Sequence, residues 1–111
     1  MSPLEITVET HGRQARIVLA GELDIASTEQ LEEELTEAEA GSPDAVVIDL
    51  RGVEFIDSTG LRALIAADER ARSSGRRLAI VRGSNAVERL FSVTQLDQRL
   101  DVVDDPESVG G

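Results

Sequence analysis

Two adjacent hydroxyl side chains, Ser58 and Thr59, stand between Asp57 and Gly60 near the middle of the 111-residue chain. They follow the apolar run 45–50 after a short predicted loop, and a helical pattern begins directly after them. The first N–H groups of a helix lack partners inside the helix, and the helix dipole makes that end partly positive. A hydroxyl at this junction can therefore cap the helix, or it can carry a phosphate that the helix end tolerates. The local pattern leaves both roles open.

Side chains for other kinds of chemistry are scarce. The single histidine, His11, falls in a predicted hairpin turn remote from Ser58, so a nucleophilic triad is not expected. The chain has no Lys, which excludes the usual phosphate-cradling loop of nucleotide hydrolases and argues against a receiver domain phosphorylated on Asp57. It has no Cys, and its carboxylates show no metal-ligand spacing. We therefore expect no catalytic residue, no metal and no cofactor, and we do not expect an enzyme.

The charge and the apolar runs limit the possible partners. The formal net charge of -11 should repel nucleic acid and anionic lipid. An acidic surface would suit a basic protein partner, although it also serves solubility alone. The N-terminal residues do not read as a signal peptide, and the longest apolar runs are far shorter than the about 20 residues that span a bilayer. These features, and the lack of Cys, predict a cytoplasmic protein without membrane insertion.

The apolar patterns predict one α/β domain with the order β-β-α-β-α-β-α-β. Residues 4–10 alternate like a half-buried strand, and the continuous apolar run 45–50 indicates a strand at the sheet centre. A hairpin followed by βαβ units implies a mixed sheet with the helices largely on one face. The other expected elements are a turn at 11–13, strands at 15–20, 77–82 and 100–103, helices at 27–40, 59–74 and from 84 or 85, a turn at 94–97 and a brief helix from about 104.

Some side chains carry finer predictions. Residues 21–26 and 51–57 read as loops, with Glu22 and Asp24 in solvent. Ser27 and Gln30 have the spacing of a capping box. Asp68 lies close to the buried stripe of its helix, where an ion pair with Arg72 would keep it at the margin. Five apolar residues in or beside the two loops are expected to be buried: Leu23, Ile25, Val53, Phe55 and Ile56.

The run from Asp49 to Leu61, which reads DLRGVEFIDSTGL, resembles the signature of the anti-sigma-factor antagonists, the STAS domain family. The segment 21–24, GELD, resembles the other characteristic loop of the family, and residues 84–97 match the usual pattern of its tail. The similarity covers about residues 4–103. The resemblance thus implies that residues 1–111 are a single STAS domain with a STAS-like mixed sheet.

The resemblance also implies a function. An anti-sigma factor with serine kinase activity would phosphorylate Ser58, and a protein phosphatase would remove the phosphate. The unphosphorylated antagonist would bind the anti-sigma factor and free the sigma factor, whereas the phosphorylated form would not bind. Asp24 matches a family position that contacts the partner, and Asp57, Thr59 and Gly60 come with it as neighbours of the serine. The alternative is an accessory STAS subunit of a transport or sensory complex, which would use the same surface for docking without phosphorylation.

Overall fold

The computed structural model describes residues 3–109. It contains the predicted order of elements, with the short helix α4 where a turn was expected and a 3-10 helix, η1, near the C-terminus. The strands are β1 (Glu5–His11), β2 (Gln14–Leu23), β3 (Ala45–Ile56), β4 (Arg77–Val81) and β5 (Val102–Val103). The helices are α1 (Thr28–Ala40), α2 (Ser58–Ser74), α3 (Asn85–Val93), α4 (Leu96–Arg99) and η1 (Pro106–Val109).

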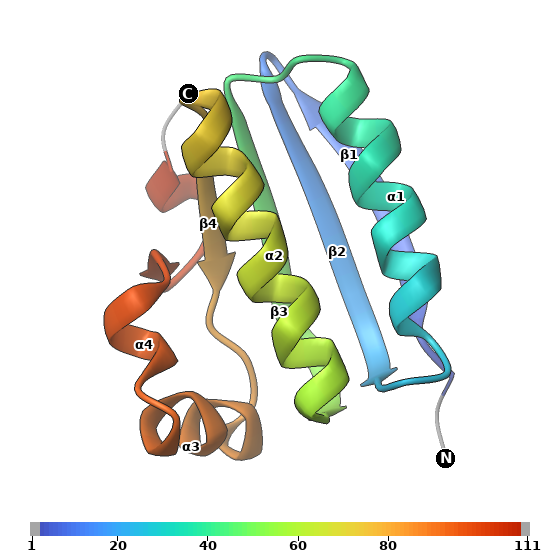
Figure 1. Ribbon diagram of the computed structural model, residues 1–111, viewed down its shortest axis with the longest axis vertical. Helices are drawn as coiled ribbons and strands as arrows, with labels where there is room; N and C mark the ends of the chain where they lie inside the picture. The colour runs from blue at the N-terminus through green and yellow to red at the C-terminus, as the bar shows by residue number, and fades with distance from the viewer. Residues whose placement is uncertain (1–2, 110–111) are drawn as a thin grey trace.

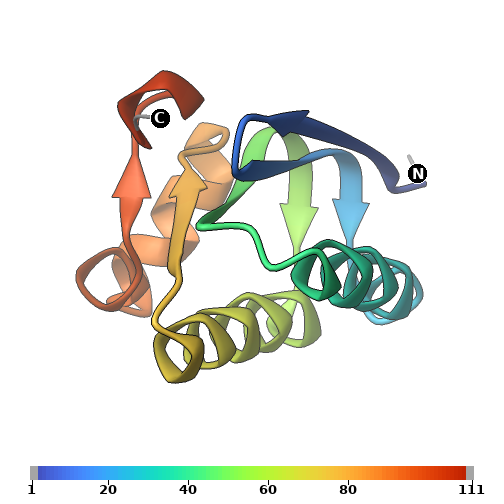
Figure 2. The ribbon, with the colours of Figure 1, turned by 90° about the horizontal axis from the view of Figure 1, so that it is seen from above.

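The strands form one mixed sheet in the order β1-β2-β3-β4-β5. β1 and β2 are antiparallel, and the other neighbours are parallel, so the apolar strand β3 lies at the centre as predicted. Figure 1 shows α1 and α2 side by side on one face of the sheet. The view from above shows η1 on the opposite side and α3 near the end of β4 (Figure 2). The parallel arrangement brings the carboxyl ends of β2 and β3 to the same edge.

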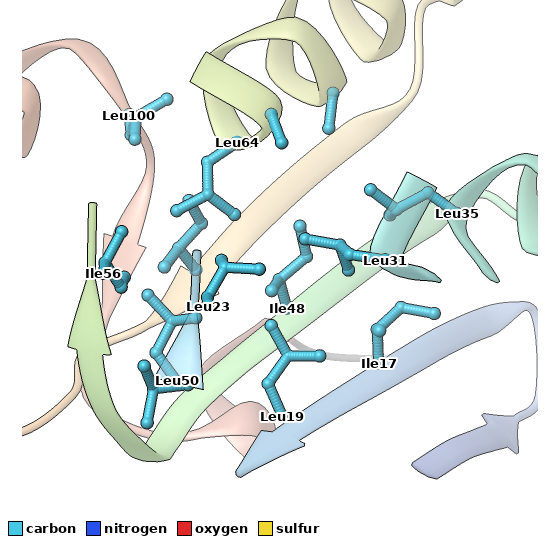
Figure 3. Packing of buried hydrophobic residues seen from close by; sticks show 14 of the residues in the cluster. Ile17, Leu19, Leu23, Leu31, Leu35, Ile48, Leu50, Ile56, Leu64 and Leu100 are labelled. Carbon is cyan, nitrogen blue, oxygen red and sulfur yellow. The ribbon is translucent and has the colours of Figure 1, made fainter. Parts of the chain in front are cut away.

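The core lies between the sheet and the two long helices. Alternate residues of a strand share one face, and residues three or four apart share one face of a helix. The apolar faces of the strands and helices therefore pack together in a single cluster. Burying each large aliphatic side chain stabilises the fold by about 1.5–3 kcal/mol. Figure 3 shows the fully buried members from β2, β3, α1 and α2: Ile17, Leu19, Leu23, Ile48, Leu50, Leu31, Leu35 and Leu64.

β2 and β3 extend further than the sequence predicted. Residues 21–23 and 51–56 were expected to be loops, but Gly21 pairs with Val53 and Leu23 pairs with Ile56 within the parallel ladder. The register shifts between Val18 and Ala20 and again after Gly21, and each shift adds one residue to β3, so β3 loses its simple alternation whereas β2 keeps it through Leu23. The loop prediction was wrong at 51–56 because β3 is irregular there, and at 21–23 because the mixture of acidic and apolar residues suggests a loop although it alternates. Because of this added length, β2 and β3 end side by side at the pair Leu23 and Ile56, two residues before Ser58.

Local side-chain predictions met mixed outcomes. Ser27 precedes α1 but makes no capping bond, because its hydroxyl donates to the Glu22 carbonyl (2.9 Å) and accepts from the Asp24 N–H (3.0 Å). The prediction of a capping box at Ser27 was therefore wrong. The ion pair at the buried margin of α2 is confirmed: Asp68 is 4% exposed, and its Oδ2 lies 2.8 Å from Arg72 Nε.

Candidate functional site

Ser58 is the first residue of α2, and its side chain is exposed. The cap of the helix is Asp57, whose Oδ1 accepts a hydrogen bond from the Gly60 N–H at 3.0 Å. Within residues 3–109, the Ser58 hydroxyl has no hydrogen-bond partner, and Thr59 beside it is half-buried. The structure thus removes one of the two roles that the sequence left open, because Asp57 rather than a hydroxyl caps the helix, and the Ser58 side chain is exposed.

The loop between β2 and α1 adjoins this turn. The Asp57 N–H donates to the Leu23 carbonyl at 3.2 Å, and Asp57 Oδ2 accepts from the Ile25 N–H at 3.0 Å. One residue therefore joins the two loops through its main chain and its side chain. The structure places the GELD segment next to Ser58, as a shared site requires.

Asp24 shapes its own loop. Its Oδ1 accepts from the N–H groups of Ala26 (3.0 Å) and Ser27 (3.2 Å), and its main-chain carbonyl accepts from the Thr28 N–H (2.9 Å) and hydroxyl (2.7 Å). Asp24 is consequently half-buried rather than fully in solvent, which corrects the prediction for this residue. Glu22 is likewise half-buried. The side chain of Asp24 thus stabilises the loop whatever else it contacts.

Two apolar side chains beside Ser58 are exposed, although both were predicted to be buried. Ile25 is 76% exposed and Phe55 is 49% exposed. Adjacent residues of a strand face opposite sides, so the burial of Ile56 in the core turns Phe55 away from it. Ile25 lies beyond the end of β2, where alternation no longer applies. Within residues 3–109 the only other large apolar side chains with comparable exposure are Val8 and Val93.

The structure also locates Gly60 and His11. Gly60 is buried where α2 approaches the ends of β2 and β3. His11 lies at the hairpin, opposite Gln14 at the amino end of β2, and is far along the sheet from Ser58 as expected. Among residues 3–109 no group of three or more His, Cys, Asp or Glu side chains is placed to hold a metal ion. None of the helices in that range is long and apolar enough to cross a membrane.

A sequence model of the family described as "Mlab, STAS domain" matches residues 6–104. The chain belongs to the STAS domain family. This STAS domain is 38% identical over 81 residues to the anti-sigma-F factor antagonist RsfB of Mycobacterium tuberculosis, a match covering 73% of this chain and 66% of RsfB. It is 28% identical over 99 residues to the anti-sigma-B factor antagonist of Staphylococcus aureus, covering 89% of this chain and 92% of that protein.

A solved structure agrees with this assignment. The crystal structure of an anti-sigma factor antagonist from Mycobacterium paratuberculosis superposes on this STAS domain with a TM-score of 0.82 and 28% sequence identity. The superposition covers 95% of this chain and 89% of the other. The mixed five-stranded sheet is therefore a STAS fold, which confirms the predicted fold class.

Proposed function

We propose that this STAS domain is an anti-sigma-factor antagonist switched by phosphorylation of Ser58. The unphosphorylated form binds an anti-sigma factor with serine kinase activity and so releases the sigma factor. The observation that carries the proposal is the division of roles at the start of α2. Because Asp57 caps the helix, the Ser58 hydroxyl is exposed and has no partner within residues 3–109. The names of the M. tuberculosis and S. aureus relatives support the choice of partner.

The electrostatics of the site suit a switch that leaves the fold intact. A phosphate on Ser58 adds about -1.5 to -2 charges. For each unit of that charge, the helix terminus contributes roughly 0.3–1 kcal/mol of stabilisation, and a carboxylate such as that of Asp57 opposes it by about 1 kcal/mol if it lies 4 Å away in water. These contributions nearly cancel in the free protein. At an interface, an unpaired buried charge costs several kcal/mol, and about 3 kcal/mol is already a hundredfold in affinity.

The proposal assigns roles to the residues around Ser58. Asp24 and Thr59, both half-buried beside the exposed serine, contact the partner. Gly60 has no side chain and is buried, so it serves the site by its shape. A protein phosphatase restores the binding form. The protein acts as a binding module rather than as an enzyme, and because its partner controls a sigma factor, it acts in the cytoplasm.

The test combines the protein with ATP and each serine-kinase anti-sigma factor encoded in the same genome. Intact mass should show one added phosphate on the wild type and on Ser73→Ala, the matched control at an exposed serine near the other end of α2, but none on Ser58→Ala. Ser58→Ala should bind the anti-sigma factor, and Ser58→Asp should bind it about a hundredfold more weakly, as a buried charge predicts.

The proposal fails if no kinase adds phosphate and Ser58→Asp binds every candidate as the wild type does. Binding to a transport or sensory complex that is indifferent to Ser58→Asp would then favour the alternative role as an accessory subunit. The exposed side chains of Ile25 and Phe55 are compatible with that docking role as well.

A further inference from the structure

We infer that Asp57 is a positioning residue that presents Ile25 to the anti-sigma factor, an inference that rests on the proposed function. The two oxygens of its carboxylate serve different loops. Oδ1 accepts from the Gly60 N–H at 3.0 Å and caps α2, whereas Oδ2 accepts from the Ile25 N–H at 3.0 Å in the loop after β2. Asp57 therefore acts on the partner through Ile25 and not by touching the partner itself.

Ile25 needs such support because the core does not hold its side chain. The side chain is 76% exposed, and the residue lies beyond the last pair of the ladder, Leu23 with Ile56. The neighbouring part of the loop is fixed by the Asp24 carboxylate, which binds the N–H groups of Ala26 and Ser27. The hydrogen bond to Asp57 ties Ile25 to the first turn of α2, so its position follows that of Ser58.

The position of Ile25 identifies what it contacts. A kinase that phosphorylates Ser58 must approach the turn to which Ile25 is tied, so its surface reaches Ile25 as well. Phe55, three residues before Ser58, is a second half-exposed apolar side chain. Transfer of an isoleucine side chain from water into an apolar pocket is worth about ten- to a hundredfold in affinity. The occupant is therefore an anti-sigma factor surface with an apolar pocket, and the acidic chain favours basic groups around that pocket.

Two substitutions at Asp57 separate the effect of its hydrogen bond to Ile25 from that of its cap on α2. Asn and Ser are both strong N-cap residues, but each has one side-chain acceptor oxygen where Asp57 has two. With that oxygen at the position of Oδ1, accepting from the Gly60 N–H, no acceptor remains at the position of Oδ2 for the Ile25 N–H. We expect Asp57→Asn and Asp57→Ser to melt close to the wild type and to bind the anti-sigma factor about tenfold more weakly. Ile25→Ala should weaken binding about as much, and Val8→Ala, an exposed apolar residue on β1, should not weaken it.

The decisive measurement is a double-mutant cycle with a probe that does not involve the partner. Asp57→Ser combined with Ile25→Ala should bind no more weakly than Ile25→Ala alone, because both changes remove the same contact. Hydrogen exchange of the Ile25 amide, followed by NMR on the free protein, should be faster in Asp57→Ser than in the wild type.

Several outcomes would overturn the inference. Additive losses in the double variant would show that Asp57 touches the partner directly. Wild-type affinity in Ile25→Ala would show that the partner does not use this side chain. An unchanged exchange rate of the Ile25 amide in Asp57→Ser would show that the carboxylate does not hold the loop. A wild-type chain that binds no anti-sigma factor would refute the proposed function itself, and this result is distinguishable because it needs no variant.

Discussion

Gly60 lies against the end of β2 so closely that no side chain fits between Gly60 and Leu23. A Cβ atom at position 60 would stand 2.9 Å from Leu23 Cγ and 2.9 Å from the Leu23 carbonyl oxygen. It would also stand 3.0 Å from Cγ2 of Ile56. This close approach seats the first turn of α2 on the ends of two strands, and it therefore determines where Ser58 is displayed.

Gly60→Ala should lower the free energy of unfolding by about 1–3 kcal/mol, the usual cost of overpacking a well-filled site. The matched control is Gly41→Ala at the end of α1, because Gly41 has a φ of -78° and a Cβ there would meet only the Ala38 oxygen at an ordinary 3.5 Å. Denaturant unfolding of both variants makes the comparison. Equal stabilities would mean that the contact between α2 and β2 has more room than the structure shows.

Phosphorylation of Ser58 should change the free energy of unfolding by no more than about 1 kcal/mol, because helix-end attraction and repulsion from Asp57 nearly cancel. Ser58→Asp should behave similarly. Thermal melts and backbone NMR shifts of the modified and unmodified protein measure this. Ala67→Asp gives the contrast, since the same charge placed at a fully buried position of α2 should cost several kcal/mol. A large fall in stability on phosphorylation would mean that the switch refolds the domain.

Arg51→Met should destabilise the fold by about 1–3 kcal/mol without weakening binding to the anti-sigma factor. Asp49 is 3% exposed, and Arg51 donates to both of its carboxylate oxygens at 2.7–3.1 Å, hydrogen bonds that raise the pKa of Arg51 above its ordinary value. Removing the guanidinium leaves a buried carboxylate with less support. Arg13→Met is the control, because Arg13 and Asp44 are both exposed and such pairs contribute about 0–1 kcal/mol. Chemical unfolding of the two variants should separate them.

Asp24→Asn should keep the loop and reduce the rate of association with the anti-sigma factor. An Asn oxygen can still accept from the Ala26 and Ser27 N–H groups, so the melting temperature should stay near that of the wild type. Loss of the negative charge should slow binding and weaken its dependence on salt, as removal of a charge at an interface rim does. Asp24→Ala should lose stability as well. Stopped-flow association at several salt concentrations measures the effect, and an unchanged rate would restrict Asp24 to shaping the loop.

The sequence predicted the fold where the hydrophobic pattern was regular. The continuous apolar run of β3 correctly indicated the sheet centre, and the capping and stop signals located α2 and α3 closely. The pattern failed at residues 51–56, because two register shifts add residues to β3 and break the alternation on which strand prediction depends. Residues 21–23 do alternate in β2, but their mixture of acidic and apolar side chains suggests a loop. The turn expected at 94–97 is confirmed at Thr94 and Gln95, where Gln95 is left-handed (φ 61°), but it is shorter than expected because α4 begins at Leu96.

At the site, residue types pointed to Ser58, and the family resemblance pointed to the loop that contains Asp24, but neither showed which residue caps α2. Capping by Asp57 rather than by a hydroxyl depends on where α2 begins, and a boundary of one residue is beyond what spacing can determine. The exposure of Ile25 and Phe55 escaped prediction for another reason. Apolar side chains are usually buried, and surfaces that bind partners are among the places where this rule does not hold.

The carboxyl ends of the parallel strands β2 and β3 lie near Ser58, and this determines where the protein can be attached to a surface. Val109 lies at the opposite end of the sheet, where its carbonyl oxygen accepts from Arg77 at the start of β4 (Figure 1). Pro3 and Leu4, by contrast, line the same hollow as Asp24 and Ser27. An affinity handle or fluorophore attached on the carboxyl-terminal side of Val109 should leave the serine face clear for a sensor surface, whereas one attached before Pro3 would crowd it.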